Sequence, residues 1–162
     1  MQDIIQLQRA TVEEHIRAEN AKDWEGVYNT FVQSEAAYYD VVPLATRFQG
    51  IAGVKGFYQA INAAFPDFQI TVTGEYDTPG CSIREVTISG THQGEYSGVP
   101  ASGRGVEFEL AAFYLFGEGE NAGKLLSERI YFDNELLMRQ IRGQVDAPTK
   151  IGLAVHSSGS GV

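Results

Sequence analysis

Cysteine is nearly absent from this chain, in which Cys81 is the only one among 162 residues. A single cysteine excludes an intrachain disulfide, and no group of Cys and His residues has the spacing of a structural zinc site, so we expect no metal. Cys81 stands at the start of an expected strand with no histidine near it in the sequence. This setting favours a small packing residue over a nucleophile.

Basic residues are also few, with 12 Lys and Arg against 21 Asp and Glu and a formal net charge of -9. Because the chain has no basic cluster, we expect neither nucleic acid nor an anionic membrane as its partner. No apolar run approaches the length of a membrane-spanning helix, and the first residues lack the basic and apolar regions of a secretory leader. We therefore expect a soluble cytoplasmic protein.

Hydrophobic residues are plentiful, at 43% of the chain, and aromatic residues make up 11%. A chain of this length can bury one well-filled core but is too short for two ordinary domains. We expect a single domain over residues 1–143, followed by a flexible tail over residues 144–162 that is rich in Gly and Ser.

The hydrophobic period changes from helical to strand-like along the chain. Helical spacing predicts helices over residues 3–22, from the N-cap Asp23 onward, and over residues 50–65 and 135–142. Alternation predicts strands over residues 36–42, from Phe68 onward, and over residues 82–92, 106–117 and 124–133. This order predicts an α+β fold, with the N-terminal helices packed in the concave face of a curved antiparallel sheet. The inside of such a cone is the expected ligand site.

Alternation along the strands and the apolar helical stripe select candidate pocket residues. Ala112 would leave room for a ligand among its larger neighbours. Each tyrosine has a second interpretation as an ordinary core residue. The expected substrate-binding residues are Tyr38, Phe57, Tyr58, Phe65, Val86, Ile88, Phe108, Leu110, Tyr114 and Tyr131.

The last expected strand has two mixed faces, so its orientation stays open. One face carries Glu128, Ile130 and Phe132, and the other carries Arg129, Tyr131 and Asp133. If the second face points inward, these three side chains form a polar ladder on an apolar wall. Otherwise they belong to a dimer surface or to solvent. On the first helix, His15 can pair with Glu19 across one turn, and we interpret that pair as a surface feature.

Several segments together resemble the SnoaL-like polyketide cyclase family, within the nuclear-transport-factor-like cone fold. They are residues 50–58, 64–68, 90–94, 100–104 and 128–133, and the resemblance covers roughly residues 11–143. It implies an α+β cone that is commonly dimeric through the outer face of its sheet and that uses no metal or organic cofactor. Phe113 and Leu115 are placed to take part in such a homodimer.

The resemblance also implies site residues. Asp133 matches the aspartate that acts as general acid and base in intramolecular aldol ring closure, and His92 matches a histidine near the pocket, with Arg129 assisting. The implied reaction is cyclisation or isomerisation of a hydrophobic, carbonyl-rich secondary metabolite. Asp133 has the alternative role of capping the last helix, and His92 of bonding to loop backbone. The rival functions are a non-catalytic small-molecule binder or dimerising scaffold and, more distantly, epoxide opening or dehydration.

Overall fold

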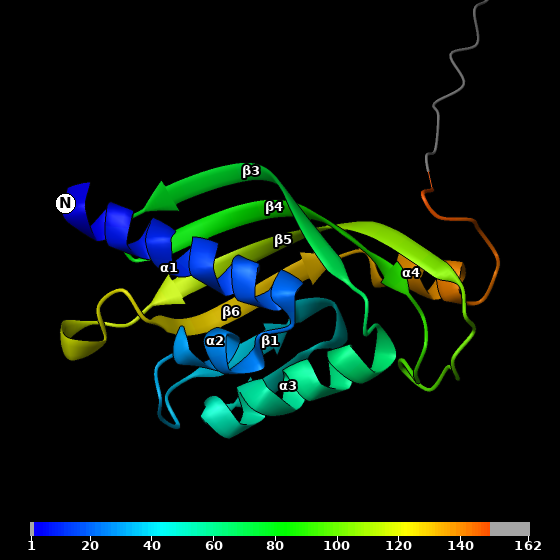
Figure 1. The fold of residues 1–162 in the computed structure, drawn as a ribbon, viewed down its shortest axis with the longest axis horizontal. Coiled ribbons are helices and arrows are strands. Elements are labelled where there is room, and N and C mark those ends of the chain that lie inside the picture. Colours follow the sequence, from blue (N-terminus) through cyan, green and yellow to red (C-terminus); the bar gives the residue numbers. More distant parts are fainter. Residues whose placement is uncertain (1, 150–162) are drawn as a thin grey trace, which may run out of the picture.

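The computed structural model describes residues 2–149 and contains four α-helices around one six-stranded sheet (Figure 1). The helices are α1 (Gln2–Ala21), α2 (Trp24–Asn29), α3 (Gly50–Ala64) and α4 (Asn134–Ile141). The strands are β1 (Tyr38–Val41), β2 (Thr46–Gln49), β3 (Gln69–Thr78), β4 (Cys81–Thr91), β5 (Gly105–Phe116) and β6 (Leu125–Phe132). Two short 3-10 turns, Val42–Leu44 and Gly119–Asn121, complete the elements.

The sheet has the strand order β2-β1-β6-β5-β4-β3. Strands β3 to β6 pair antiparallel in succession, whereas β1 pairs with β6 in parallel. The expected α+β cone is therefore confirmed, with a mixed rather than a wholly antiparallel sheet. Strand β2 was not predicted from the sequence, because it is a four-residue edge strand whose mostly exposed side chains show no apolar alternation.

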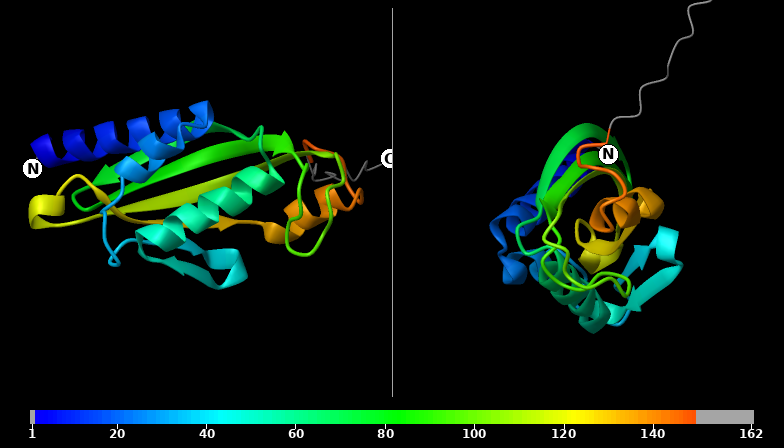
Figure 2. Two further views of the ribbon diagram at one scale, coloured as in Figure 1. Left: turned by 60° about the horizontal axis from the view of Figure 1, so that its bottom comes forward. Right: turned by 90° about the vertical axis from the view of Figure 1, so that its right-hand side faces the viewer.

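The sheet curves strongly, and helices cover its concave side. Figure 1 shows α1 running across the long strands, with α3 on the other side of the enclosed space. In the end-on view of Figure 2, β3 and β4 arch over one side, β1 and β2 lie opposite, and α4 sits at the near end. The core fills this interior, where Phe31 and Leu125 are completely buried.

Local signals in the sequence explain the ends of two helices. Asp23 caps α2 by accepting a hydrogen bond from the Gly26 backbone N–H at 3.0 Å, and Asp133 caps α4 by accepting one from the Leu136 N–H at 3.0 Å. Each cap accepts a hydrogen bond from a backbone N–H of the first helical turn that has no partner within the helix. Each aspartate thereby fixes the direction in which its helix leaves the preceding segment.

The chain beyond α4 continues against that helix for a few residues. The Gln144 backbone N–H donates to the Arg139 carbonyl at 2.8 Å, and Thr149 Oγ1 lies 3.3 Å from Gln140 Nε2. The rest of the predicted flexible tail lies outside the described residues. Over residues 2–149, none of the helices combines the length and the apolar character needed to cross a membrane.

Candidate functional site

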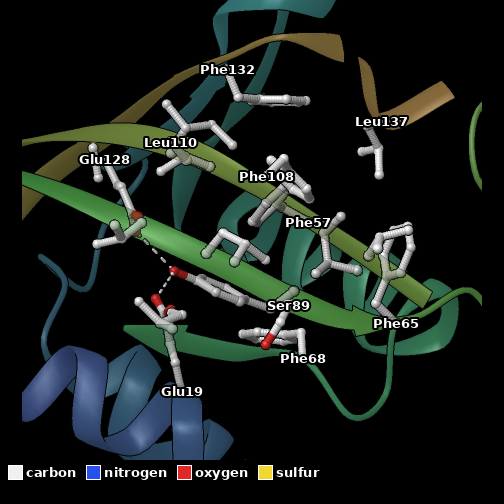
Figure 3. A pocket seen from close by; sticks show the side chains of 18 of the residues that line it. Glu19, Phe57, Phe65, Phe68, Ser89, Phe108, Leu110, Glu128, Phe132 and Leu137 are labelled. Carbon is white, nitrogen blue, oxygen red and sulfur yellow. Dashed lines mark hydrogen bonds between the residues drawn. The ribbon is translucent and has the colours of Figure 1, made fainter. Parts of the chain in front are cut away.

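A pocket lies inside the cone, between α1, α3 and the concave face of the sheet (Figure 3). Its walls are mostly aromatic and aliphatic, and its cavity volume is about 90 Å³. Sites for drug-sized ligands commonly measure about 300–1,000 Å³. In this conformation the pocket therefore fits a small molecule, and a multi-ring ligand would require its side chains to move.

Most of the predicted substrate-binding residues line this pocket. They come from α3, whose apolar stripe faces the sheet, and from the inward faces of β4 and β5. Ala112 also lines it, between larger neighbours on β5. The predicted residues found in the wall are Phe57, Tyr58, Phe65, Val86, Ile88, Phe108, Leu110 and Tyr114.

Tyr38 and Tyr131 do not line the pocket. The Tyr38 ring lies under the Arg47 guanidinium, 4.0 Å from ring centroid to Cζ, and Tyr131 is 39% exposed. Tyr39 takes the inward place on β1 and stacks on Phe57 with ring centroids 3.7 Å apart. Because side chains alternate along a strand, the choice between two adjacent tyrosines decides which one reaches the interior.

Arg129 also lies on the outer face, where it forms part of an ion-pair group. Its Nε donates to Asp40 Oδ2 at 3.0 Å, and Arg47 donates to the same carboxylate through Nε and Nη2 at 2.7 and 2.9 Å. The Arg47 hydrogen bonds, with help from Arg129, hold the pKa of Asp40 below its usual value although burial opposes them. This arrangement makes Arg129 a sheet-surface residue without a route to the pocket.

Asp133 is exposed at the N-terminus of α4 and is not part of the pocket wall. Its neighbours Phe132 and Leu137 do line the pocket, so the carboxyl lies just past the inward-facing end of β6. Within residues 2–149, the one hydrogen bond of its side-chain carboxyl is the cap to the Leu136 N–H. The structure thus shows the capping role, and Arg129 and Asp133 together supply no water-activating set inside the cone.

His92 is fully buried but lies outside the pocket wall. Its Nδ1 is 2.9 Å from Ser102 Oγ and accepts from the Ser102 backbone N–H at 3.2 Å, while its ring packs on Phe65 at 5.6 Å between centroids. These contacts tie the loop after β4 to the segment before β5. In this arrangement His92 holds the loops around Phe65 in place.

Substitution of Asp133 separates its capping role from a catalytic one. We expect Asp133→Ala to lower the free energy of unfolding by about 1 kcal/mol, because Ala cannot accept the Leu136 N–H, while Asp133→Asn stays nearly neutral. Neither change should alter the rate of an acid/base reaction in the pocket by more than about twofold. Urea unfolding checks the first expectation, and a large loss of turnover in Asp133→Asn with unchanged stability would restore Asp133 as the acid/base group.

The predicted pairing of His15 with Glu19 is confirmed, but its placement on the surface is wrong, because both residues are buried in an unpredicted cluster of ionisable groups at one end of the pocket. Tyr58 Oη lies 2.8 Å from Glu19 Oε1, 2.9 Å from Glu128 Oε2 and 3.0 Å from His15 Nε2. His15 Nε2 is also 3.0 Å from Glu128 Oε2 and contacts Glu19 directly. Figure 3 shows Glu19 and Glu128 at the end of the pocket remote from Phe65 and Leu137. We call His15, Glu19, Tyr58 and Glu128 the carboxyl cluster.

Three elements, α1, α3 and β6, bring the cluster together, and Tyr58 is its member from α3. His15 and Glu19 are four residues apart on α1 and share one helical face, and Glu128 belongs to the inward face of β6 with Ile130. None of the four residues is more than 4% exposed. The available signals were an acidic residue inside an apolar strand and a His/Glu pair beside the buried Val12 and Ile16, and only the fold shows that they meet.

Burial and mutual contact shift the proton affinities of the cluster. Burial alone would lower the pKa of His15, but the Glu19 and Glu128 carboxylates outweigh it and raise that pKa to about 10. Burial and the nearby Glu19 raise the pKa of Glu128 more strongly than His15 lowers it. Burial likewise raises the pKa of Tyr58 well above its usual value. A carboxyl with raised pKa in an apolar pocket can donate a proton near neutral pH.

The same atoms merit comparison with a metal site. Within residues 2–149, His15, Glu19 and Glu128 are the group whose ligand atoms all lie within 4.8 Å of one another. The Tyr58 hydroxyl bonds to all three, so hydrogen bonds among the members fill the space between the ligand atoms. We interpret the cluster as a proton-sharing group.

Comparison with known proteins identifies the family. The model of the family described as SnoaL-like polyketide cyclase matches residues 8–141. No curated protein sequence matches the chain. Among solved structures, a candidate SnoaL-like polyketide cyclase from Jannaschia sp. CCS1 is 19% identical with a TM-score of 0.75, covering 90% of this chain and 96% of that one.

Two proteins from Streptomyces share the fold at similar identity. AclR of Streptomyces galilaeus, a candidate hydroxylase, is 20% identical with a TM-score of 0.71, covering 87% of this chain and 98% of its own. IdmH of Streptomyces antibioticus, a candidate polyketide cyclase, is 22% identical with a TM-score of 0.68, covering 83% and 98%. The structural likeness establishes the fold, and the family match over residues 8–141 shows that the chain belongs to the SnoaL-like polyketide cyclase family.

Proposed function

We propose that the protein is a cofactor-independent cyclase or isomerase that acts by acid/base chemistry on a small, hydrophobic carbonyl compound. The observation that carries this proposal is an apolar pocket with two buried carboxyl groups at one end. Apolar walls favour a hydrophobic substrate, and the carboxyls can donate and accept protons where the substrate oxygen would lie. Family membership supports the reaction class, in which a proton leaves carbon next to a carbonyl.

The pocket volume bears on the substrate. A cavity of about 90 Å³ accommodates a compact ring more readily than a polycyclic metabolite. A suitable probe is therefore 3-cyclohexen-1-one, a single-ring ketone whose conversion to conjugated 2-cyclohexen-1-one is followed by ultraviolet absorbance. The conversion needs removal of one proton next to the carbonyl and its return two carbons further along, with no change in oxidation state.

A matched pair of substitutions on β5 tests whether the reaction takes place in the pocket. Ala112 lines the cavity and is 1% exposed, whereas its neighbour Ala111 faces the opposite side of the sheet. We expect Ala112→Phe to fill the cavity and reduce kcat/KM for the probe at least 100-fold. Ala111→Phe should leave turnover within about twofold.

Thermal unfolding of both variants provides the control, because inserting a large side chain into a packed core destabilises by about 1–3 kcal/mol. Equal turnover in a folded Ala112→Phe variant would contradict catalysis in this pocket.

The expected homodimer through the outer sheet face stays a prediction. That face does carry Phe113 and Tyr131 in an edge-to-face pair, with ring centroids 5.3 Å apart.

The small cavity also favours a second candidate function, a non-catalytic binder of small apolar molecules. In that case the pocket would bind cyclohexanone with the same dependence on Ala112, but the wild-type protein would not convert 3-cyclohexen-1-one. Binding by calorimetry together with absence of turnover would select this alternative over the enzyme.

A further inference from the structure

Hydrogen-bond geometry fixes one proton of the carboxyl cluster at His15 Nδ1. Thr30 Oγ1 lies 2.6 Å from the Val27 carbonyl oxygen and 2.8 Å from His15 Nδ1. A carbonyl only accepts, so the single hydroxyl proton of Thr30 points to Val27. Thr30 Oγ1 must then accept from His15, which places a proton on Nδ1 and turns Nε2 toward the carboxyls.

The second ring nitrogen cannot face the carboxyls as a bare lone pair. Nε2 contacts both Glu19 and Glu128, and a lone pair on Nε2 is repelled by the Glu19 carboxylate that lies directly beside it. A proton on Nε2 makes His15 an imidazolium that donates to these oxygens. The i,i+4 spacing on α1 keeps this cation directly beside Glu19.

Charge counting requires one more proton. An imidazolium and two carboxylates leave a net charge of −1 in a group that is at most 4% exposed. An uncompensated buried charge is strongly unfavourable, and the group becomes neutral by binding a proton. Since Glu19 is held by the cation on its own helix, the proton falls to Glu128, which hydrogen-bonds with the neutral Tyr58 hydroxyl.

We propose that Glu128 is the general acid of the pocket and Glu19 its general base, with His15 as the positioning residue that keeps Glu19 ionised. This inference rests on the proposed function and assigns its roles. Contacts within the cluster use Glu19 Oε1 and Glu128 Oε2. The buried hydroxyls of Tyr39 and Tyr114 also face Glu128, so a ligand oxygen would share that carboxyl with them. The implied substrate is an enolisable ketone or aldehyde that enters with its oxygen first.

The proton inventory balances for the probe ketone. Glu19 takes the proton from the carbon between the carbonyl and the alkene, the electron pair shifts to form the dienol, and the carbonyl oxygen takes a proton from Glu128. Glu19 then returns its proton to the far alkene carbon while Glu128 recovers its own from the oxygen. Both carboxyls end as they began, and nothing is oxidised or reduced.

Turnover of 3-cyclohexen-1-one by matched glutamine variants tests the roles. Glu19→Gln and Glu128→Gln should each lower kcat by about 10²–10⁴-fold, the usual contribution of a positioned acid or base. The control is Glu14→Gln on the same helix, whose carboxylate is exposed and bonds to Arg17. Its kcat should stay within about twofold. Full activity of a folded Glu128→Gln variant would overturn the inference while leaving the proposed function standing.

A spectroscopic measurement on the unliganded protein gives a readout that does not depend on turnover. The infrared spectrum of the wild type at pH 7 should show the carbonyl stretch of one buried neutral carboxylic acid. The difference between wild type and Glu128→Gln should contain this band, and the difference between wild type and Glu14→Gln should not. His15→Gln should increase this signal, because the cation that contacts both buried carboxyls is then absent. A wild-type spectrum without a neutral acid overturns the inference.

The experiments distinguish failure of the proposed function from failure of the proton assignment. If the wild type leaves the probe unchanged, the proposed function fails, and the infrared spectrum alone decides the proton assignment. Loss of turnover in EDTA that a divalent cation restores would overturn the assignment, because the cation would replace the hydrogen bonds of Tyr58.

Discussion

His15→Leu is expected to lower the free energy of unfolding by about 3–5 kcal/mol at pH 8, the usual effect of removing one partner from a buried charge group. Leucine has a similar volume to histidine, so little of this loss comes from a cavity. The substitution leaves Glu19 and Glu128 buried without their cation. Urea unfolding at pH 8 measures the loss.

The pH dependence identifies the source of that loss. The folded pKa of His15, about 10, exceeds the unfolded value of 6.5, so its contribution is fully present below pH 6.5 and disappears as the pH rises through 10. The difference in free energy of unfolding between wild type and His15→Leu should therefore be largest at or below pH 6.5 and shrink as the pH rises toward 10. A difference that stays constant from pH 6 to 10 would point to packing alone.

Adding Glu19→Gln gives a test of sign. In the wild type this change removes the partner of the imidazolium and should destabilise the protein. In the His15→Leu background it removes one of two unpaired carboxylates and should recover part of the lost stability. Destabilisation in both backgrounds would contradict the charge assignment.

Arg84→Met is expected to lower the free energy of unfolding by about 3 kcal/mol, for a related reason at another buried ion pair. Arg84 on β4 is 1% exposed, and its Nη1 donates to Asp77 Oδ1 at 3.0 Å and to the Ile83 carbonyl at 2.9 Å. Methionine fills much of the arginine volume but leaves Asp77 with the Ser82 hydroxyl and the partly exposed Arg9.

Arg9 offers the matched control, because it contacts the same carboxylate from the surface. Its Nη1 lies 3.5 Å from Asp77 Oδ2, and its side chain is 45% exposed. Exposed ion pairs contribute about 0–1 kcal/mol, so Arg9→Met should lower the free energy of unfolding by no more than about 1 kcal/mol. Equal losses in Arg84→Met and Arg9→Met would show that burial does not govern this pair.

Much of the architecture could be predicted because its signals are local. The stripe of Val54, Phe57, Ile61 and Phe65 defines α3, and Pro66 marks its end. Alternation in β4 and β5 placed their pocket residues on the inward face, since Val86 and Phe108 belong to long runs with one apolar side. The parallel pairing of β1 with β6 had no such local signal.

The reactive end of the pocket was harder to predict because it depends on register and on distant contacts. Both faces of β6 are mixed, so the sequence did not distinguish Glu128 from Arg129 as the inward residue. On β1, adjacent tyrosines made the same ambiguity, and Tyr39 rather than Tyr38 reaches the interior. His15 looks like a surface residue until Glu128, 113 positions away, supplies its second buried partner.

The most direct test is a crystal structure with bound phenol, a single ring whose hydroxyl resembles the enol of the proposed intermediate. The account predicts the ring among Phe57, Val86 and Leu110, with its oxygen within hydrogen-bonding distance of Glu128 or Glu19. Phenol bound with its oxygen at Asp133, or on the outer face of the sheet, would contradict it.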